Sequence, residues 1–162
     1  MKKIFCILIL PILLFYSCSG YTPIFSTSNL NFKIIEHSIE GNKEIGNLIY
    51  SKLNNLTKGK KEDPTTKTIK IIINSSKNKK ATSKNSAGKI LEYKIIGKVN
   101  LKVLDYYTND TILNQDFISS LSYKVTSQYS QTADQERKAF EDIINKIYQD
   151  LLIQVSRSIA EK

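Results

Sequence analysis

Residues 93–103 alternate between apolar and polar side chains, and this alternation constrains the fold more than any other feature of the sequence. The apolar positions that would share one face are Tyr93, Ile95, Val99, Leu101 and Val103. The polar positions that would share the other face are Lys94, Lys98, Asn100 and Lys102. Because successive side chains of a strand point to opposite faces of its sheet, this pattern predicts a half-buried antiparallel strand.

Three further segments are expected to be strands. Residues 32–39 and 68–74 are rich in β-branched side chains and partly alternate. The tight-turn sequence Thr108-Asn109-Asp110 precedes a strand with an inner face of Leu113, Phe117, Leu121, Tyr123 and Val125. Residues 75–89 are polar and contain five lysines but no acid, so we expect them to form a long loop between two strands.

Two segments have the apolar spacing of helices. In the first, apolar residues recur at helical spacing: Ile45, Leu48, Ile49, Leu53 and Leu56. Asn42 is suited to cap this helix and Gly59 to end it. In the second, residues 133–160, the apolar stripe is Phe140, Ile143, Ile144, Ile147, Leu151, Leu152, Val155 and Ile159. Thr132 and Gln135 have the spacing of a capping box at its start.

The predicted element order is therefore β-α-β-β-β-α. This order favours an α+β fold, with two helices packed on one face of a four-stranded, mainly antiparallel sheet. We expect residues 32–162 to form a single domain of this kind.

The N-terminus has the three parts of a bacterial lipoprotein signal. Lys2 and Lys3 precede the apolar residues 4–15, which are too few to span a bilayer, and Ser17-Cys18 ends the segment like a lipobox. We expect residues 1–17 to be removed, Cys18 to carry the lipid anchor and residues 18–31 to form a tether. The alternative is an ordinary signal peptide that happens to contain a cysteine. Because Cys6 would leave with the signal, no internal disulfide is expected.

The formal net charge of +9 favours an anionic partner. For an exported lipoprotein, an anionic lipid or glycan is a better candidate than nucleic acid, so no nucleic acid partner is expected. The alternative is that the lysines reflect the composition of an AT-rich genome.

The sequence shows no catalytic constellation. The single histidine, His37, lies in a predicted strand, where a packing role is expected. Four carboxylates of the last helix are expected to lie on its solvated face: Asp134, Glu136, Glu141 and Asp142. We therefore predict no metal site, no cofactor and no enzymatic activity.

Three features together resemble the LptE family of lipopolysaccharide-assembly lipoproteins, in particular its alphaproteobacterial branch. They are the lipobox followed by Cys18-Ser19-Gly20-Tyr21-Thr22-Pro23-Ile24-Phe25, the β-α-β-β-β-α order, and the Glu136-Arg137-Lys138-Ala139 sequence early in the last helix. The additional Ser19 before Gly20 departs from the family pattern.

The resemblance implies an outer-membrane lipoprotein on the periplasmic side that plugs and assembles the β-barrel protein LptD and binds lipopolysaccharide. For the glycolipid contact we select Lys77, Lys79, Lys80 and Lys84 of the predicted loop, because Lys ammonium groups pair with phosphates and carboxylates. The alternative for these lysines is a solvated linker. For the whole chain, the alternatives are an adaptor lipoprotein of another envelope transport complex and a lipid-anchored enzyme.

Overall fold

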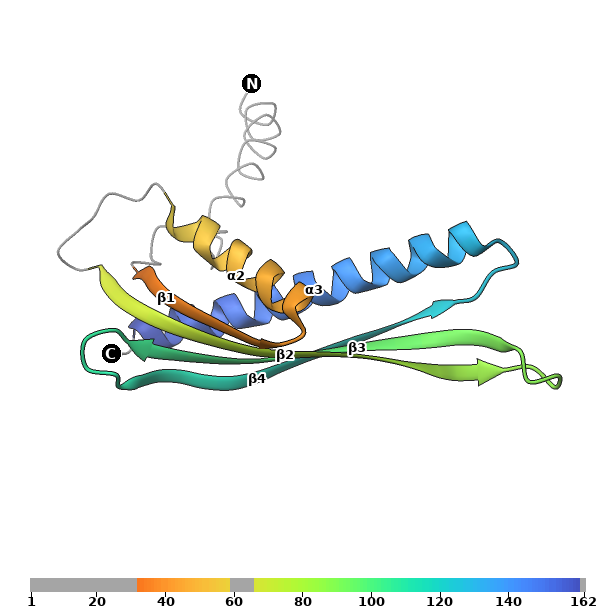
Figure 1. The fold of residues 1–162 in the computed structure, drawn as a ribbon, viewed down its shortest axis with the longest axis horizontal. Helices are drawn as coiled ribbons and strands as arrows, with labels where there is room; N and C mark the ends of the chain where they lie inside the picture. The colour runs from red at the N-terminus through yellow and green to blue at the C-terminus, as the bar shows by residue number, and fades with distance from the viewer. Residues whose placement is uncertain (1–31, 59–65, 161–162) are drawn as a thin grey trace, which may run out of the picture.

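A computed structural model describes residues 32–58 and 66–160 of the chain, and it has the predicted α+β architecture. The element order is β1 (Phe32–Gly41), α2 (Lys43–Thr57), β2 (Lys67–Lys84), β3 (Ile90–Asp105), β4 (Thr111–Lys124) and α3 (Tyr129–Ala160). The sheet order is β1-β2-β3-β4, with β1 parallel to β2 and the other neighbours antiparallel. Both helices lie on the same face of the sheet (Figure 1). The predicted fold class is confirmed.

The core lies between this covered face and the two helices. β2 and β3 contribute alternate buried residues, among them Ile71, Ile73, Val99 and Leu101, so the alternation predicted for β3 is confirmed. α2 buries Ile45, Ile49 and Leu53, whereas Leu48, expected on the same face, is 40% exposed. α3 contributes its predicted stripe, including Ile143, Ile147 and Leu151. These side chains account for the packing of both helices on a single sheet face.

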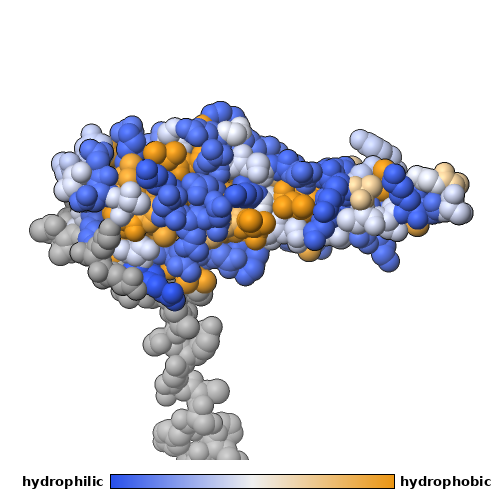
Figure 2. Space-filling model, turned by 90° about the horizontal axis from the view of Figure 1, so that it is seen from below, coloured by the Kyte–Doolittle hydropathy of each residue, from blue (hydrophilic) through white to orange (hydrophobic). Residues whose placement is uncertain are grey.

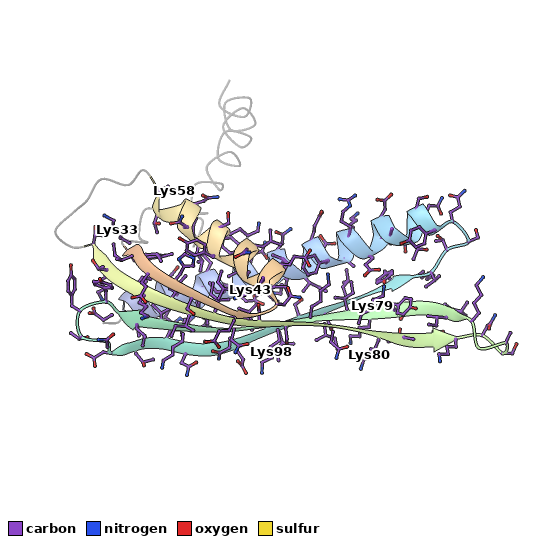
Figure 3. All side chains as sticks on the ribbon, in the orientation of Figure 1. Lys33, Lys43, Lys58, Lys79, Lys80 and Lys98 are labelled. Atoms are coloured by element: carbon purple, nitrogen blue, oxygen red, sulfur yellow. The ribbon has the colours of Figure 1, made fainter. Side chains whose placement is uncertain are left out.

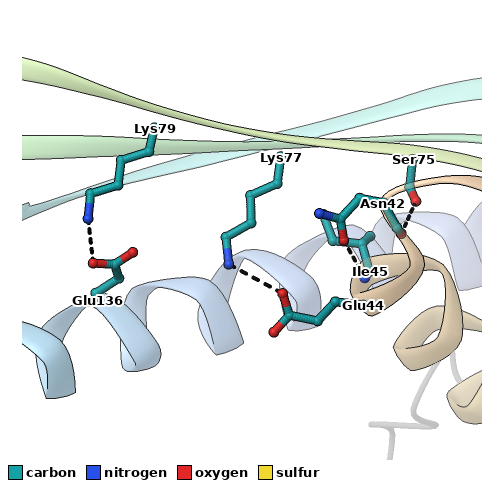
Figure 4. Close-up of polar contacts among 7 residues, drawn as sticks. All are labelled: Asn42, Glu44, Ile45, Ser75, Lys77, Lys79 and Glu136. Atoms are coloured by element: carbon teal, nitrogen blue, oxygen red, sulfur yellow. Dashed lines mark hydrogen bonds and ion pairs between the residues drawn. The ribbon is translucent and has the colours of Figure 1, made fainter.

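The junction between β1 and α2 is held against β2. Gly41 has a φ of +73°, and a Cβ there would lie 2.1 Å from the Ser75 carbonyl oxygen. The Asn42 backbone N–H donates to that same oxygen at 2.7 Å, and the Ser75 hydroxyl donates to the Asn42 carbonyl at 2.7 Å. The Asn42 side chain accepts from the backbone N–H of Ile45, which confirms the predicted N-cap (Figure 4). Gly59, the predicted end of this helix, lies outside the described residues.

The predicted loop over residues 75–89 is wrong, because β2 continues to Lys84. β2 and β3 pair along their whole length, from Ile69 opposite Asp105 to Lys84 opposite Ile90. Only Asn85–Lys89 form the turn, in which the Asn85 side chain accepts backbone N–H groups of Ala87 and Lys89. Beyond Ser75 this polar strand pairs with β3 alone, and the ammonium groups of Lys77 and Lys79 lie over the rings of Phe140 and Tyr93. We call residues 77–96 the distal hairpin.

The last helix begins one turn earlier than predicted, at Tyr129 instead of Ala133. Thr132 is not the cap: its hydroxyl accepts the backbone N–H of Thr126 at 3.0 Å, and its own N–H donates to the Gln128 carbonyl at 3.2 Å. The two threonines therefore hold the β4–α3 connection, which lets the helix extend over an additional turn. Its 32 residues are about 48 Å long at ~1.5 Å per residue.

Candidate functional site

The lysines selected from the sequence do not form one cluster, because they lie on a strand and point to opposite faces of the sheet. Lys79 points toward α3 and Lys80 points away from it (Figure 3). Lys77 shares the face of Lys79, since the two are separated by two positions and both contact the helices. Lys84 is the last residue of β2, beside the turn. Lys77 and Lys79 therefore belong to a different environment from Lys80.

The two inward lysines each have a carboxylate partner, although residues 75–89 themselves contain no acid. Lys77 Nζ lies 3.5 Å from a Glu44 carboxylate oxygen of α2 and 3.7 Å from the centre of the Phe140 ring. Lys79 Nζ lies 2.5 Å from Glu136 of α3 (Figure 4). The sequence interpretation missed these partners because they belong to helices distant in the sequence. A signal was present: Ser75, Lys77 and Lys79 continue the inward register of Ile69, Ile71 and Ile73.

Glu136 connects the distal hairpin to α3 through a small polar network. The Tyr123 hydroxyl donates to Glu136 at 2.7 Å, and Lys79 also lies 4.4 Å from the centre of the Tyr93 ring. Partial burial raises the pKa of the Glu136 carboxyl, but hydrogen bonds from Lys79 and Tyr123 outweigh it and leave that pKa below its usual value. Burial also lowers the pKa of Lys79, but its own hydrogen bonds with Glu136 and Tyr123 reverse the shift to a net increase.

The four carboxylates expected on a solvated helix face therefore have different roles. Asp134 and Glu141 agree with the prediction, since both are exposed and pair with Arg137 of the same helix. Glu136 contradicts it, because it faces the sheet. Within the described residues, no group of three His, Cys, Asp or Glu side chains is arranged to hold a metal ion.

His37 has the packing role that its position predicted. Its ring stacks on Tyr50 of α2, with ring centroids 3.8 Å apart and an interplanar angle of 11°. The ring thus helps to hold β1 beneath α2.

The opposite face of the sheet is covered by neither described helix, and we call it the outer face. Viewed from below, it is mainly hydrophilic and is interrupted by separate apolar groups (Figure 2). Its positions on the three long strands include Lys80, Asn78, Ser76, Lys70, Lys94, Lys98, Asn100, Lys102, Asp116 and Ile118. The half-buried strand predicted from residues 93–103 is confirmed, because both described helices lie on the side opposite Lys94, Lys98, Asn100 and Lys102.

Cations of the outer face are only partly neutralised. Lys98 pairs with Asp116 at 2.9 Å, and hydrogen bonds from Lys98 and Asn100 lower the pKa of that carboxyl. Lys80 and Lys94, by contrast, are directly opposite each other on β2 and β3. Neither of them, nor Lys102, takes part in the ion pairs formed among residues 32–58 and 66–160. Like charges directly opposite each other destabilise a strand pair, so this arrangement favours an added anion.

Solved structures with the same architecture come from bacterial lipoproteins. Lipoprotein B of Nitrosomonas europaea is 20% identical, with a TM-score of 0.62 over 85% of this chain and 91% of that chain. A lipoprotein of Caulobacter crescentus CB15 is 12% identical, with a TM-score of 0.55 over 83% of this chain and 95% of that chain. The minor lipoprotein of Acinetobacter baumannii is 12% identical, with a TM-score of 0.56 over 79% and 92%.

This chain has the fold of those lipoproteins. At such low identities the likeness concerns the fold alone. No family model matches the chain, and no curated protein matches it in sequence. Neither described helix combines the length and the apolar character that a membrane span requires. Cys18, the predicted lipidation site, lies outside the described residues.

Proposed function

We propose that this chain is a lipid-anchored, non-enzymatic subunit of lipopolysaccharide transport at the outer membrane, bound to an LptD-like β-barrel. The observation that carries the proposal is the uncovered outer face with its unneutralised lysines, on a fold shared with envelope lipoproteins. The Ser17-Cys18 lipobox supports attachment to a membrane from the periplasmic side. The LptE-like sequence features support the choice of lipopolysaccharide and of the barrel as partners.

The distribution of the lysines revises which of them would contact the glycolipid. Lys77 and Lys79 already have carboxylate partners. To bind an external anion, each would first have to lose its ion pair, which disfavours their use. Lys80, Lys94 and Lys102 have no such competition within the described part of the chain. Lys84 also takes part in none of the ion pairs described above, but it lies at the turn end of β2, apart from these three. We therefore assign the phosphate and carboxylate groups of lipopolysaccharide to these three lysines.

Binding of purified lipopolysaccharide to the full chain in detergent tests this assignment. Lys80, Lys94 and Lys102 replaced together by Gln should weaken binding severalfold and reduce its salt dependence, because exposed charges are screened over a Debye length of about 8 Å. The matched control removes three exposed lysines of the helix side, Lys58, Lys138 and Lys146. Equal weakening in both variants would show that the total charge matters and not the outer face.

A second experiment separates the proposal from the alternative of an adaptor for another envelope complex. The tagged chain is purified from solubilised outer membranes, and the proposal requires a stable complex with a large β-barrel protein. An associated inner-membrane transporter in place of a barrel would favour the adaptor.

A further inference from the structure

β4 is an open edge of the sheet. Among the described residues it pairs only with β3. The opposite edge is formed by β1 as far as Ser75 and, beyond it, by residues 76–84 of β2, which carry four lysines and two register irregularities. Along two antiparallel strands, every second pair of opposed residues exchanges backbone hydrogen bonds. In the pairs between them, the backbone N–H and C=O groups point away from the neighbouring strand. Val125 N–H donates to the Leu91 carbonyl at 2.8 Å, so the odd-numbered residues of β4 bond to β3 in this register. The even-numbered residues from Asn114 to Ser122 therefore direct their N–H and C=O groups to the open edge.

The two edges differ in how they are protected against an added strand. β1 has ten residues, a register irregularity between Ile34 and Glu36, and charged side chains along its length. β4 has fourteen residues, no proline, and only Asp116 and Lys124 as charged side chains. Bulges and charges are the usual protection of sheet edges. β4 has its own register irregularity at Thr111–Leu113, but residues 114–122 have none and carry Asp116 as their only charge, and Ile118 among them is 62% exposed.

Two separate hollows lie between β4 and α3, which runs antiparallel to the strand. The first, of about 390 Å³, has a largely apolar floor that includes Leu121, Tyr123 and Ala139. The second, of about 280 Å³, is lined by Gln115 and Gln154, whose side-chain oxygens are acceptors, and by Asp116 and Asp150. The two carboxylates are about half exposed and each pairs through one oxygen, with Lys98 and Lys146, so the other oxygen can still accept a hydrogen bond. Both hollows are lined by inward and outward residues of β4, so both wrap around its edge.

The spacing of the hollows matches an extended chain. On β4 they are centred about six residues apart, which is about 20 Å at ~3.4 Å per residue. On α3 they are centred about fourteen residues apart, which is about 21 Å at ~1.5 Å per residue. Strand and helix thus run side by side over the length of a short strand. Six residues is an even number, so both anchoring side chains of an added strand would point to the same face.

We propose that β4 accepts an extended segment of a partner protein as a fifth, antiparallel strand. The segment carries an apolar side chain for the first hollow and, six residues later, a Lys, Arg or Gln side chain that donates to the acceptors of the second. This inference goes beyond the proposed function, because it depends on neither lipopolysaccharide nor an outer-membrane barrel.

A second copy of this chain does not fit the same edge. Neighbouring strands lie about 4.8 Å apart, whereas packed helices need about 8–10 Å between their axes. α3 lies over β4, with the Tyr123 hydroxyl bonded to Glu136, so a second β4 would bring its own α3 into collision. The occupant is therefore a strand that has no helix on that face.

The test uses a synthetic peptide as the probe and the full chain in detergent. The peptide alternates threonine and valine over nine residues, with leucine at its second position and lysine at its eighth. At a peptide concentration ten times Kd, amide exchange measured by NMR should slow about tenfold at Ile118 and Ser120, whose N–H groups point to the open edge. The N–H of Ser119 points to β3 and already bonds to it, so its exchange rate should change little.

One matched pair of variants controls the experiment. Ser120→Pro removes an N–H that points to the open edge and should abolish peptide binding. Ser120→Ala keeps that N–H and should bind the peptide normally. If the proline variant fails to fold, a peptide N-methylated at the backbone positions facing β4 takes its place and should not bind.

Three results would overturn the proposal. They are protection confined to β1 or to the outer face, binding that persists with the N-methylated peptide, and no binding at millimolar peptide. Protection of the β4 edge that rises with protein concentration in the absence of peptide would assign the edge to a second copy instead.

Discussion

Replacing Glu136 by Gln tests how the distal hairpin is held to α3. The amide side chain keeps the volume and can still accept from the Tyr123 hydroxyl, but the ion pair with Lys79 is lost. A hydrogen bond to a charged group that is shielded from solvent contributes about 1.5–3 kcal/mol to the free energy of unfolding. A solvent-exposed ion pair contributes about 0.2–1 kcal/mol. Because the two side chains are 32% and 38% exposed, we discount the shielded value and expect a loss of about 1 kcal/mol in the free energy of unfolding.

The pH dependence of this loss follows from the pKa of Glu136. That pKa is lower in the folded protein than its usual value, since the hydrogen bonds from Lys79 and Tyr123 outweigh the effect of burial. A carboxyl with a depressed folded pKa stabilises the fold above its unfolded pKa, and this stabilisation disappears as the pH falls through the folded pKa. The difference between the wild type and Glu136→Gln should therefore be full at neutral pH and disappear in acid.

Urea unfolding followed by circular dichroism measures the effect. With a slope of about 2 kcal/mol per molar, a loss of 1 kcal/mol shifts the midpoint by about 0.5 M. The control is Glu141→Gln, whose carboxylate pairs with Arg137 on the exposed face of α3 and should cost less than about 0.5 kcal/mol. Equal losses in the two variants, or a difference that survives in acid, would refute the reasoning.

Three further variants test the packing and the anchor. Gly97→Val should cost about 1–3 kcal/mol in thermal unfolding, because a Cβ there would already lie 2.8 Å from the Ile143 side chain, and Ile143→Ala should relieve part of this penalty. Gly41→Ala should lower the free energy of unfolding by about 1–3 kcal/mol, because it places a Cβ against the Ser75 carbonyl at a residue with positive φ. An unchanged melting temperature would contradict that conformation. Cys18→Ala should abolish incorporation of a labelled fatty acid, and label retained on the variant would exclude lipidation at that residue.

The sequence by itself determined the element order, the fold class and most of the core. The alternation in β3 and the helical stripe of α3 are local repeats, and each fixes which side chains one element buries. The Asn42 cap is also local, since donor and acceptor are three residues apart.

Only the tertiary structure decided the extent of β2 and the environment of its lysines. Residues 75–84 have few of the local preferences of a strand, and their pairing depends on β3, which comes later in the chain. Lys79 bonds to Glu136, which lies 57 residues later in the chain, while Lys80 lies opposite another lysine, Lys94. A count of charges along the sequence cannot distinguish these lysines, because the alternation of strand side chains and the placement of α3 decide which of them are neutralised.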